Sequence, residues 1–324
     1  MKLQGASEII TELLSTNSRI SISDLSRISG VSRPSTSKIL ESLTEGLGLK
    51  FVLELDEAKL GYPVMHNVIV KLGKKADFEK IEDIISRNPG INFACSCKGD
   101  FDIMLQVLSK TSAEYFGWEN SFIDQICEYR PKLMASEIAK MRFGFFPVDN
   151  GFVTASGLND EDKMLITELN TNSRASIKEL GQKTRINGET IRYRMRKLAE
   201  EGIIRRFTVA SQKPTRSYAI AYLSNYVFNS KTRYKASLRL YDYFDADKLG
   251  ILNTFQNISL LSGSYKFLGI GIFKNEEDAV ENTVEKHIRA FGKDNVSITS
   301  ARILKALKGI MPFRKLNIKR NYIQ

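Results

Sequence analysis

Between residues 158 and 201, apolar residues recur at helical spacing in three successive segments. The first segment follows a run of three acids at 160–162, which suits the N-terminus of a helix. The second segment opens with a capping box, in which Ser176 precedes Glu179 by three residues. This pattern predicts two short helices ahead of a third one.

The third segment begins after a tight turn. Asn187 caps a predicted helix that runs to about Glu201, where Gly202 stops it. A run of β-forming residues at 203–209 follows, in the position that a wing would occupy. Three short helices with a tight turn before the third, followed by a strand, predict a winged helix-turn-helix.

The same plan occurs earlier in the chain, 155 residues upstream. Residues 16–22 (TNSRISI) recur as residues 171–177 (TNSRASI), and the register holds without a gap over about 30 residues. A repeat of this length indicates a duplicated whole protein rather than a solenoid unit. We call residues 1–150 copy one and residues 158–324 copy two. The uncharged stretch at 151–157, with glycine at both ends, predicts a linker.

After each helical segment the pattern changes to strands and helices in the order βαββαβ, which predicts a ferredoxin-like unit. In copy one the predicted strands are 64–72, 91–97, 103–108 and 136–143, and the helices are 77–87 and 112–129. Copy two has strands at 217–228, 258–261, 267–273 and 296–306, a helix at 276–291 and an insertion at 230–247. The predicted fold class is α+β, with two winged helix-turn-helix domains (1–60 and 158–213) alternating with two ferredoxin-like domains (61–150 and 214–324).

Charge distinguishes the two copies. The chain has 324 residues and a formal net charge of +11. Residues 1–150 carry 18 Lys and Arg against 20 Asp and Glu, whereas residues 151–324 carry 30 against 17. An excess of positive charge confined to one half of a chain indicates a polyanionic partner there, such as double-stranded DNA.

The third helix of copy two and its flanks carry much of this excess. Seven basic residues stand between positions 185 and 206, against three acids. Long basic side chains outside the buried stripe suit phosphates or base edges, and polar residues near the helix start suit the major groove. The predicted DNA contacts are Arg185, Asn187, Glu189, Thr190, Arg192, Tyr193, Arg196, Lys197, Arg205 and Arg206.

The third helix of copy one is neutral. It offers Ser32, Arg33 and Lys38 for DNA contact, but also Glu41 and Glu45. We therefore expect the second helix-turn-helix to hold DNA more strongly, and the first to be auxiliary, specific for a weaker half-site, or structural. A tail at 302–320 with seven basic residues and no acid suits either a second phosphate contact or a solvated surface.

This combination resembles the Lrp/AsnC family of feast/famine regulators. The resemblance rests on LNDED at 158–162, NSRAS at 172–176, Glu179 and Leu180, Thr190 and Ile191 with Arg194, LAEEGII at 198–204, GYP at 61–63 and GDFD at 99–102. It implies a DNA-binding domain followed by an effector and dimerisation domain in each copy, with the two sheets packed face to face. It also implies an intramolecular pseudo-dimer that joins into larger homo-oligomers, and an amino acid or other small metabolite bound between protomers.

The effector site implied by the resemblance lies at Gly99, Asp100 and Asp102. A tight turn between two strands explains the glycine equally well. Two departures weaken the duplication of function: copy one has Ile39 in the place of Arg194, and copy two has Lys266 in the place of Asp102.

Two rival functions remain open. Residues 202–207 resemble the start of a signature in sirohaem decarboxylases, which share this fold, but the expected histidine is missing from residues 211–216. A metabolite sensor without DNA binding is the other rival, and the basic helix of copy two argues against it. We therefore expect no enzyme activity and no catalytic residues.

Other features exclude further classes of protein. No apolar run reaches the roughly 18 residues of a membrane-spanning helix, and no secretion signal opens the chain. Three cysteines suit a reducing cytoplasm rather than a disulfide framework. Cys95 and Cys97 share one face of a predicted strand, where burial is favoured over metal binding. With only His66 and His287 available, we expect no metal site and no cofactor.

Overall fold

The computed structural model describes residues 2–46, 48–143, 145–211, 218–226, 255–263 and 265–311. The predicted insertion at 230–247 and the part of the basic tail beyond residue 311 lie outside the described residues. The chain divides into two compact units. The helical unit is drawn from residues 1–63, 146–213 and 309–324, and the sheet unit from residues 64–145 and 214–308. Within the described ranges, no helix combines the length and apolar character needed to cross a membrane.

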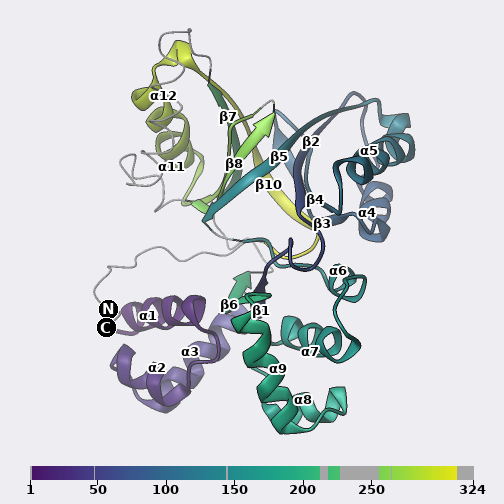
Figure 1. Cartoon of the computed structure of the whole chain (residues 1–324). Helices are drawn as coiled ribbons and strands as arrows, with labels where there is room; N and C mark the ends of the chain where they lie inside the picture. Colours follow the sequence, from purple (N-terminus) through teal and green to yellow (C-terminus); the bar gives the residue numbers. More distant parts are fainter. Residues whose placement is uncertain are drawn as a thin grey trace. The chain divides into compact units, whose positions relative to one another are not determined.

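The helical unit contains one set of three helices and a strand from each copy (Figure 1). Copy one supplies α1 (Lys2–Thr16), α2 (Ile22–Ser29), α3 (Arg33–Gly46) and β1 (Leu49–Leu55). Copy two supplies α7 (Asp160–Thr171), α8 (Ile177–Thr184), α9 (Gly188–Glu200) and β6 (Ile204–Ser211). This order of elements confirms the helix-turn-helix plan predicted from the apolar spacing.

The predicted capping residues of copy two begin their helices. Ser176 accepts a hydrogen bond from the Glu179 backbone N–H, and the Glu179 carboxylate accepts one from the Ser176 N–H. Asn187 accepts a hydrogen bond from the Thr190 N–H at 2.8 Å. Because these side chains satisfy N–H groups that a helix start leaves unpaired, they fix where α8 and α9 begin.

The strand after α9, in the position predicted for the wing, pairs with a strand of the other copy. β6 pairs in antiparallel register with β1 of copy one, from Leu49 opposite Ser211 to Leu55 opposite Ile204. Val209 of this strand joins the buried core of copy one beside Ile10. We call this two-stranded sheet the ribbon. The two helix-turn-helix domains thus share one sheet, and each contributes to the packing of the other.

The uncharged segment predicted as a linker contains a short helix, α6 (Asn150–Thr154). Phe152 and Val153 are buried, and the ring of Phe152 meets the ring of Tyr62 edge to face at 5.0 Å between centroids. The lack of charge here therefore reflects burial as well as chain connection. Sequence composition does not distinguish these two causes, because both favour small and apolar residues.

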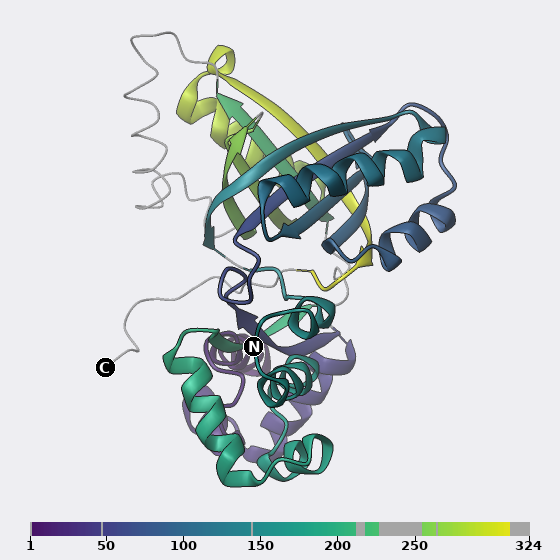
Figure 2. The same cartoon turned by 45° about the vertical axis from the view of Figure 1, so that its right-hand side comes forward.

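The sheet unit is a closed barrel of eight strands with helices on its outside (Figures 1 and 2). Copy one supplies β2 (Val64–Leu72), α4 (Phe78–Arg87), β3 (Ile91–Gly99), β4 (Ile103–Ser109), α5 (Ser112–Ile126) and β5 (Pro131–Phe143). Copy two supplies β7 (Tyr218–Tyr226), β8 (Phe255–Gly263), β9 (Phe267–Phe273), α11 (Glu276–Val280), α12 (Lys286–Phe291) and β10 (Val296–Lys308). The order βαββαβ is confirmed in copy one. In copy two the four strands and the helical segment between β9 and β10 follow the predicted order, and the segment between β7 and β8 lies outside the described residues. The helix predicted at 276–291 contains a π-helical turn at Glu281–Glu285.

The two four-stranded halves join along both of their edges. Strand β5 of copy one pairs with β8 of copy two, and β10 of copy two pairs with β3 of copy one. The expected packing of one sheet against the other is therefore accompanied by continuous backbone pairing between copies. Closure leaves no open edge in the barrel, which removes a common route to aggregation.

Candidate DNA-binding interface

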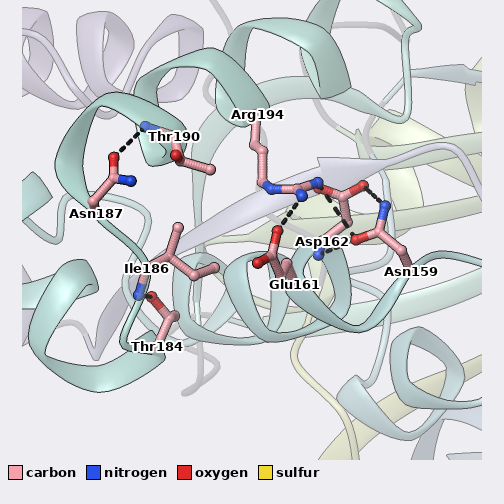
Figure 3. Close-up of polar contacts among 8 residues, drawn as sticks. All are labelled: Asn159, Glu161, Asp162, Thr184, Ile186, Asn187, Thr190 and Arg194. Carbon is pink, nitrogen blue, oxygen red and sulfur yellow. Dashed lines mark hydrogen bonds and ion pairs between the residues drawn. The ribbon is translucent and has the colours of Figure 1, made fainter.

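The turn before α9 is held by local hydrogen bonds (Figure 3). The Thr184 hydroxyl accepts a bond from the Ile186 N–H at 3.3 Å, and Asn187 closes the start of the helix. Between them Arg185 has a left-handed backbone, with φ of 59°. Copy one places Gly30 at this position, with φ of 70°. The left-handed region favours glycine, so Arg185 is less favourable than glycine there by about 1 kcal/mol. Copy two nevertheless has a basic side chain at this turn.

One side of α9 is buried and the other is exposed. The apolar spacing predicts a buried stripe of Ile191, Met195 and Leu198; Ile191 and Leu198 are fully buried, and Met195 is half-buried. The predicted contacts on the opposite side are exposed, except Thr190, which is half-buried; they are Asn187, Glu189, Arg192, Tyr193, Arg196 and Lys197. Tyr193, the one aromatic residue of this helix, is 62 % exposed. The structure therefore brings these side chains to one surface, which we call the α9 face.

Two arginines of the α9 face are available for an anion. Within the described part of the chain, neither Arg192 nor Arg196 has an ion-pair partner, whereas Lys197 lies 3.8 Å from Glu201. An unpaired, exposed guanidinium can bind phosphate or the edge of a guanine with two parallel hydrogen bonds. The α9 face thus has the chemistry of a DNA-reading surface.

Arg194 has a different environment, because it points toward the start of α7 (Figure 3). Its guanidinium donates to Asp162 at 3.0 Å and to Glu161, and lies 3.4 Å from the Asn159 side-chain oxygen. The Asp162 side chain is only 8 % exposed. The acids at 160–162, expected from the sequence only to favour a helix start, thus also include the two that bind Arg194.

Arg205 and Arg206, predicted as DNA contacts, are engaged within the ribbon. Arg205 forms an ion pair with Asp56 at 2.9 Å, and Arg206 forms one with Glu54 at 2.5 Å. Because β6 pairs with β1, the acids of copy one lie directly beside these arginines. These ion pairs compete with phosphate for both guanidinium groups, so Arg205 and Arg206 are less available to DNA than Arg192 and Arg196.

A third acid of copy one, Glu57, follows β1 and lies beside Arg205. Glu57 is 4 % exposed and stands 4.0 Å from the Arg205 guanidinium. Burial raises the pKa of Glu57 to about 7. Because a pKa near 7 leaves Glu57 only partly ionised at neutral pH, Asp56 and Glu54 are the acids that balance Arg205 and Arg206.

The third helix of copy one presents a weaker surface. Ser32, Arg33 and Lys38 are exposed, and the Ser32 hydroxyl lies 2.9 Å from that of Ser35. Glu41 and Glu45 are exposed on the same helix. The two bases and two acids of α3 therefore balance, and its attraction for phosphates is small.

The residues implied as an effector site lie where the two halves of the barrel meet. Asp100 accepts a hydrogen bond from the Ser300 N–H of β10 at 2.8 Å. Asp102 forms an ion pair with Lys71 at 3.2 Å. Gly99 has φ of +151°, and a Cβ there would stand 2.7 Å from the Ser300 carbonyl oxygen. Glycine at this position therefore permits close approach of β10, a role that the sequence analysis did not foresee.

A surface pocket of about 530 Å³ lies beside Asp102. Its lining residues are Leu72, Gly73, Lys74, Lys75, Ala76, Phe78 and Asp102. The pocket contains both signs of charge, as a site for a small zwitterion would. Gly99 and Asp100 are not among its lining residues, although Lys71 donates both to the Gly99 carbonyl oxygen at 3.1 Å and to Asp102 at 3.2 Å.

The paired cysteines are part of the barrel wall. Cys95 and Cys97 are buried in β3 with their Sγ atoms 3.7 Å apart. In the described segments, no group of three or more His, Cys, Asp or Glu side chains is arranged to hold a metal ion.

Comparison with known proteins agrees with the geometry of the helical unit. A family of winged helix-turn-helix DNA-binding domains matches residues 158–205, which confirms the predicted domain type in copy two. The HTH-type transcriptional regulator LrpC of Bacillus subtilis is 31 % identical over 130 residues, which are 40 % of this chain and 87 % of that protein. The HTH-type transcriptional regulator FL11 of Pyrococcus horikoshii is 25 % identical over 118 residues, or 36 % of this chain and 75 % of that protein.

A solved structure with a different activity resembles the chain over nearly its whole length. The siroheme decarboxylase NirDL superposes with a TM-score of 0.58 at 13 % identity, and covers 95 % of this chain and 94 % of its own. Its complex with an iron-uroporphyrin III analogue gives a TM-score of 0.59 at 14 % identity. At this identity the likeness concerns the fold.

Proposed function

The chain belongs to the Lrp/AsnC family of transcriptional regulators, and from that premise we propose that it binds double-stranded DNA sequence-specifically through the α9 face. The observation that carries the proposal is the pair Arg192 and Arg196, exposed and without ion-pair partners among the described residues. These arginines contact phosphates or guanine edges, while Glu189 and Tyr193 probe bases near the start of the helix. Duplex DNA supplies the polyanion that the charge of copy two requires.

We further propose that the chain is a fusion of two family-like protomers. LrpC matches 40 % of this chain and 87 % of its own length, as expected if the chain holds two such lengths. The boundaries that follow are 1–60, 61–150, 158–213 and 214–324, with 151–157 between the copies. Fusion gives the two copies a high effective concentration for each other. Because each chain carries one strongly basic reader, two chains suit a palindromic operator.

A small metabolite, such as an amino acid, is the proposed effector. The pocket beside Asp102 offers lysine side chains for a carboxylate and Asp102 for an amino group. Copy two has Lys266 in the place of Asp102, so the proposal assigns one such site to each chain.

Binding to DNA selected by the wild-type chain from a random duplex library tests the main proposal. We expect enrichment of one sequence, and a steep fall of affinity with salt. Substituting both Arg192→Ala and Arg196→Ala should weaken binding at least about 30-fold, at about 1–3 kcal/mol per good contact. The matched pair Arg33→Ala and Lys38→Ala in copy one should weaken it less than about fivefold. Unchanged binding by the first pair contradicts the proposal, and no binding by the wild type favours a sensor without DNA.

The fold of the siroheme decarboxylase supports a second candidate, a tetrapyrrole enzyme. Residues 211–216 lack the histidine expected after the signature at 202–207. Adding iron-uroporphyrin to the purified chain and recording its absorbance separates the two functions. A saturable spectral shift at micromolar concentration favours the enzyme, and an unshifted spectrum favours the regulator.

A further inference from the structure

Arg194 occupies the protein-facing side of α9 rather than the α9 face. It lies between the buried positions Ile191 and Leu198, three and four residues away, and its side chain is 21 % exposed. Its hydrogen bonds reach Asp162 and Glu161, the third and second residues of α7. One guanidinium thus joins the two helices, because two of its nitrogens donate to two neighbouring acids of α7.

Asp162 is itself held in place from a second direction. Asn159 accepts a hydrogen bond from the Asp162 N–H at 2.9 Å and donates to its carboxylate at 2.5 Å. The carboxylate therefore has a fixed position before Arg194 reaches it. A fixed carboxylate and a planar guanidinium define both the distance and the angle between the two helices.

Copy one lacks every part of this arrangement. At the matching positions it has Ile39 for Arg194, Ser7 for Asp162 and Ala6 for Glu161. Ile39 instead packs against the apolar core of copy one. The ion pair therefore occurs only beside the helix with the basic surface.

We propose that Arg194 and Asp162 form a clamp that sets the rotation of α9 about its own axis and so aims the α9 face at DNA. The inference rests on the proposed function. Arg194 is a positioning residue that does not contact DNA. Apolar packing of Ile191 and Leu198 holds the helix but does not fix its rotation. Side chains that contact bases must be placed within about 0.5 Å and 10–20°. The clamp supplies that constraint.

Neutralising Asp162 distinguishes the clamp from a simple charge effect, because the two predict opposite changes in DNA affinity. Removing an acid near a DNA-binding surface should tighten binding, because DNA is a polyanion. Removing Asp162 should instead weaken specific binding if its role is to hold Arg194. Asp160, two residues away and 96 % exposed, makes no contact with Arg194 and is the matched control.

The experiment measures the affinity of Asp162→Asn and Asp160→Asn for the library-selected duplex and for a shuffled duplex of the same composition. Asp162→Asn should lose about tenfold or more on the selected duplex and stay within about twofold on the shuffled one. Asp160→Asn should stay within about twofold of the wild type or bind more tightly on both. Equal behaviour of the two variants overturns the clamp and leaves the proposed function intact.

Two further variants separate the remaining explanations. Arg194→Met should repeat the loss of specificity with an unchanged slope of log affinity against log salt. A slope reduced by about 0.9 would mean that Arg194 contacts a phosphate, and would overturn the positioning role. A lower melting temperature with an unchanged ratio of specific to non-specific affinity would mean a purely structural ion pair, which also overturns it.

If Asp162→Asn does not fold, Glu161→Gln removes the second, more exposed acceptor of Arg194 beside the clamp. Its side chain is 49 % exposed, and a loss of specificity of about threefold is expected. No loss in a folded Glu161→Gln variant, together with no loss in Arg194→Met, overturns the clamp. If the wild type enriches no sequence at all, the proposed function fails first and the clamp with it.

Discussion

The two copies of the helix-turn-helix differ most on the surface that each turns outward. Arg192 and Arg196 of α9 correspond to Ser37 and Glu41 of α3, so a basic face in copy two is a neutral one in copy one. Arg185 similarly takes the left-handed position that Gly30 has in copy one. These differences change charge without changing the helices, and they indicate that one copy has become the stronger reader of DNA.

Part of the surface that the copies turn toward each other is the same in both. Ser18 and Ser173, equivalent by the repeat, share a buried hydrogen bond of 2.6 Å between their hydroxyl oxygens. Arg19 donates to the carbonyls of copy two, and its equivalent Arg174 donates to the matching carbonyls of copy one. A contact related by pseudo-twofold symmetry needs the same residue on both sides, whereas an outward surface is free to differ.

The largest effect that tests this comparison is expected on stability. Arg19 donates to the Ser173 and Ala175 carbonyls at 2.7 and 3.0 Å, and its guanidinium lies 5.6 Å from the centre of the Phe207 ring. Arg19→Ala leaves two half-buried carbonyls without this donor, so we expect a loss of about 2–3 kcal/mol in the free energy of unfolding. Urea denaturation measures it.

Symmetry makes the matching variant a strict test. Arg174→Ala should cost the same as Arg19→Ala to within about 0.5 kcal/mol, since Arg174 donates to the Ser18 and Ile20 carbonyls and lies over the Phe51 ring. Arg27→Ala, which removes an exposed ion pair with Asp24, is the control and should cost less than about 0.5 kcal/mol. If the losses of unfolding free energy in Arg19→Ala and Arg174→Ala differ by clearly more than about 0.5 kcal/mol, the two sides of the interface are not equivalent.

The sequence predicted local structure well because local signals fix it. Val64–Leu72 has the bounds that its apolar pattern predicted, and Ser176, Glu179 and Asn187 cap the helices expected of them. Each of these signals spans only a few residues along the chain. The repeat supplied the rest, because it showed that copy one and copy two share one plan.

Partners distant in sequence could not be predicted in the same way. Nothing near Arg205 shows that Asp56, 149 residues earlier, neutralises it, because this contact depends on the pairing of β6 with β1. Likewise, Asp100 contacts Ser300 across 200 residues. One usable signal was overlooked: Arg194 and Asp162 change together to apolar or neutral residues in copy one, as the two members of an ion pair would.

The barrel halves differ in a buried histidine, which predicts a pH effect. His287 of copy two is fully buried, with its Nδ1 atom 3.0 Å from the Thr283 carbonyl oxygen. Burial lowers the pKa of His287 to about 4. The folded protein therefore binds fewer protons than the unfolded one below about pH 6.5, so stability is complete above that pH and declines as the pH falls toward 4.

Urea unfolding at pH 7.5 and pH 5.0 measures this effect. We expect His287→Phe to reduce the acid-induced loss of stability by about 2 kcal/mol. His66 of copy one is half-buried, and burial lowers its pKa while Glu137 and Glu119 raise it, so His66→Gln should change that loss less. An equal change in both variants would show that the halves do not differ in this respect.

The smallest expected effect decides whether the first helix-turn-helix contacts DNA. Glu41 of α3 corresponds to Arg196 of α9, so Glu41→Arg restores one basic residue of the α9 face in copy one. If α3 lies along the duplex, affinity should rise about tenfold and the slope of log affinity against log salt should steepen by about 0.9. Glu8→Arg on α1 makes the same change of charge at an exposed position outside the reading helices. If Glu41→Arg gains no more than this control, α3 does not contact DNA, and the first helix-turn-helix serves the chain only through the ribbon and the contacts of Arg19.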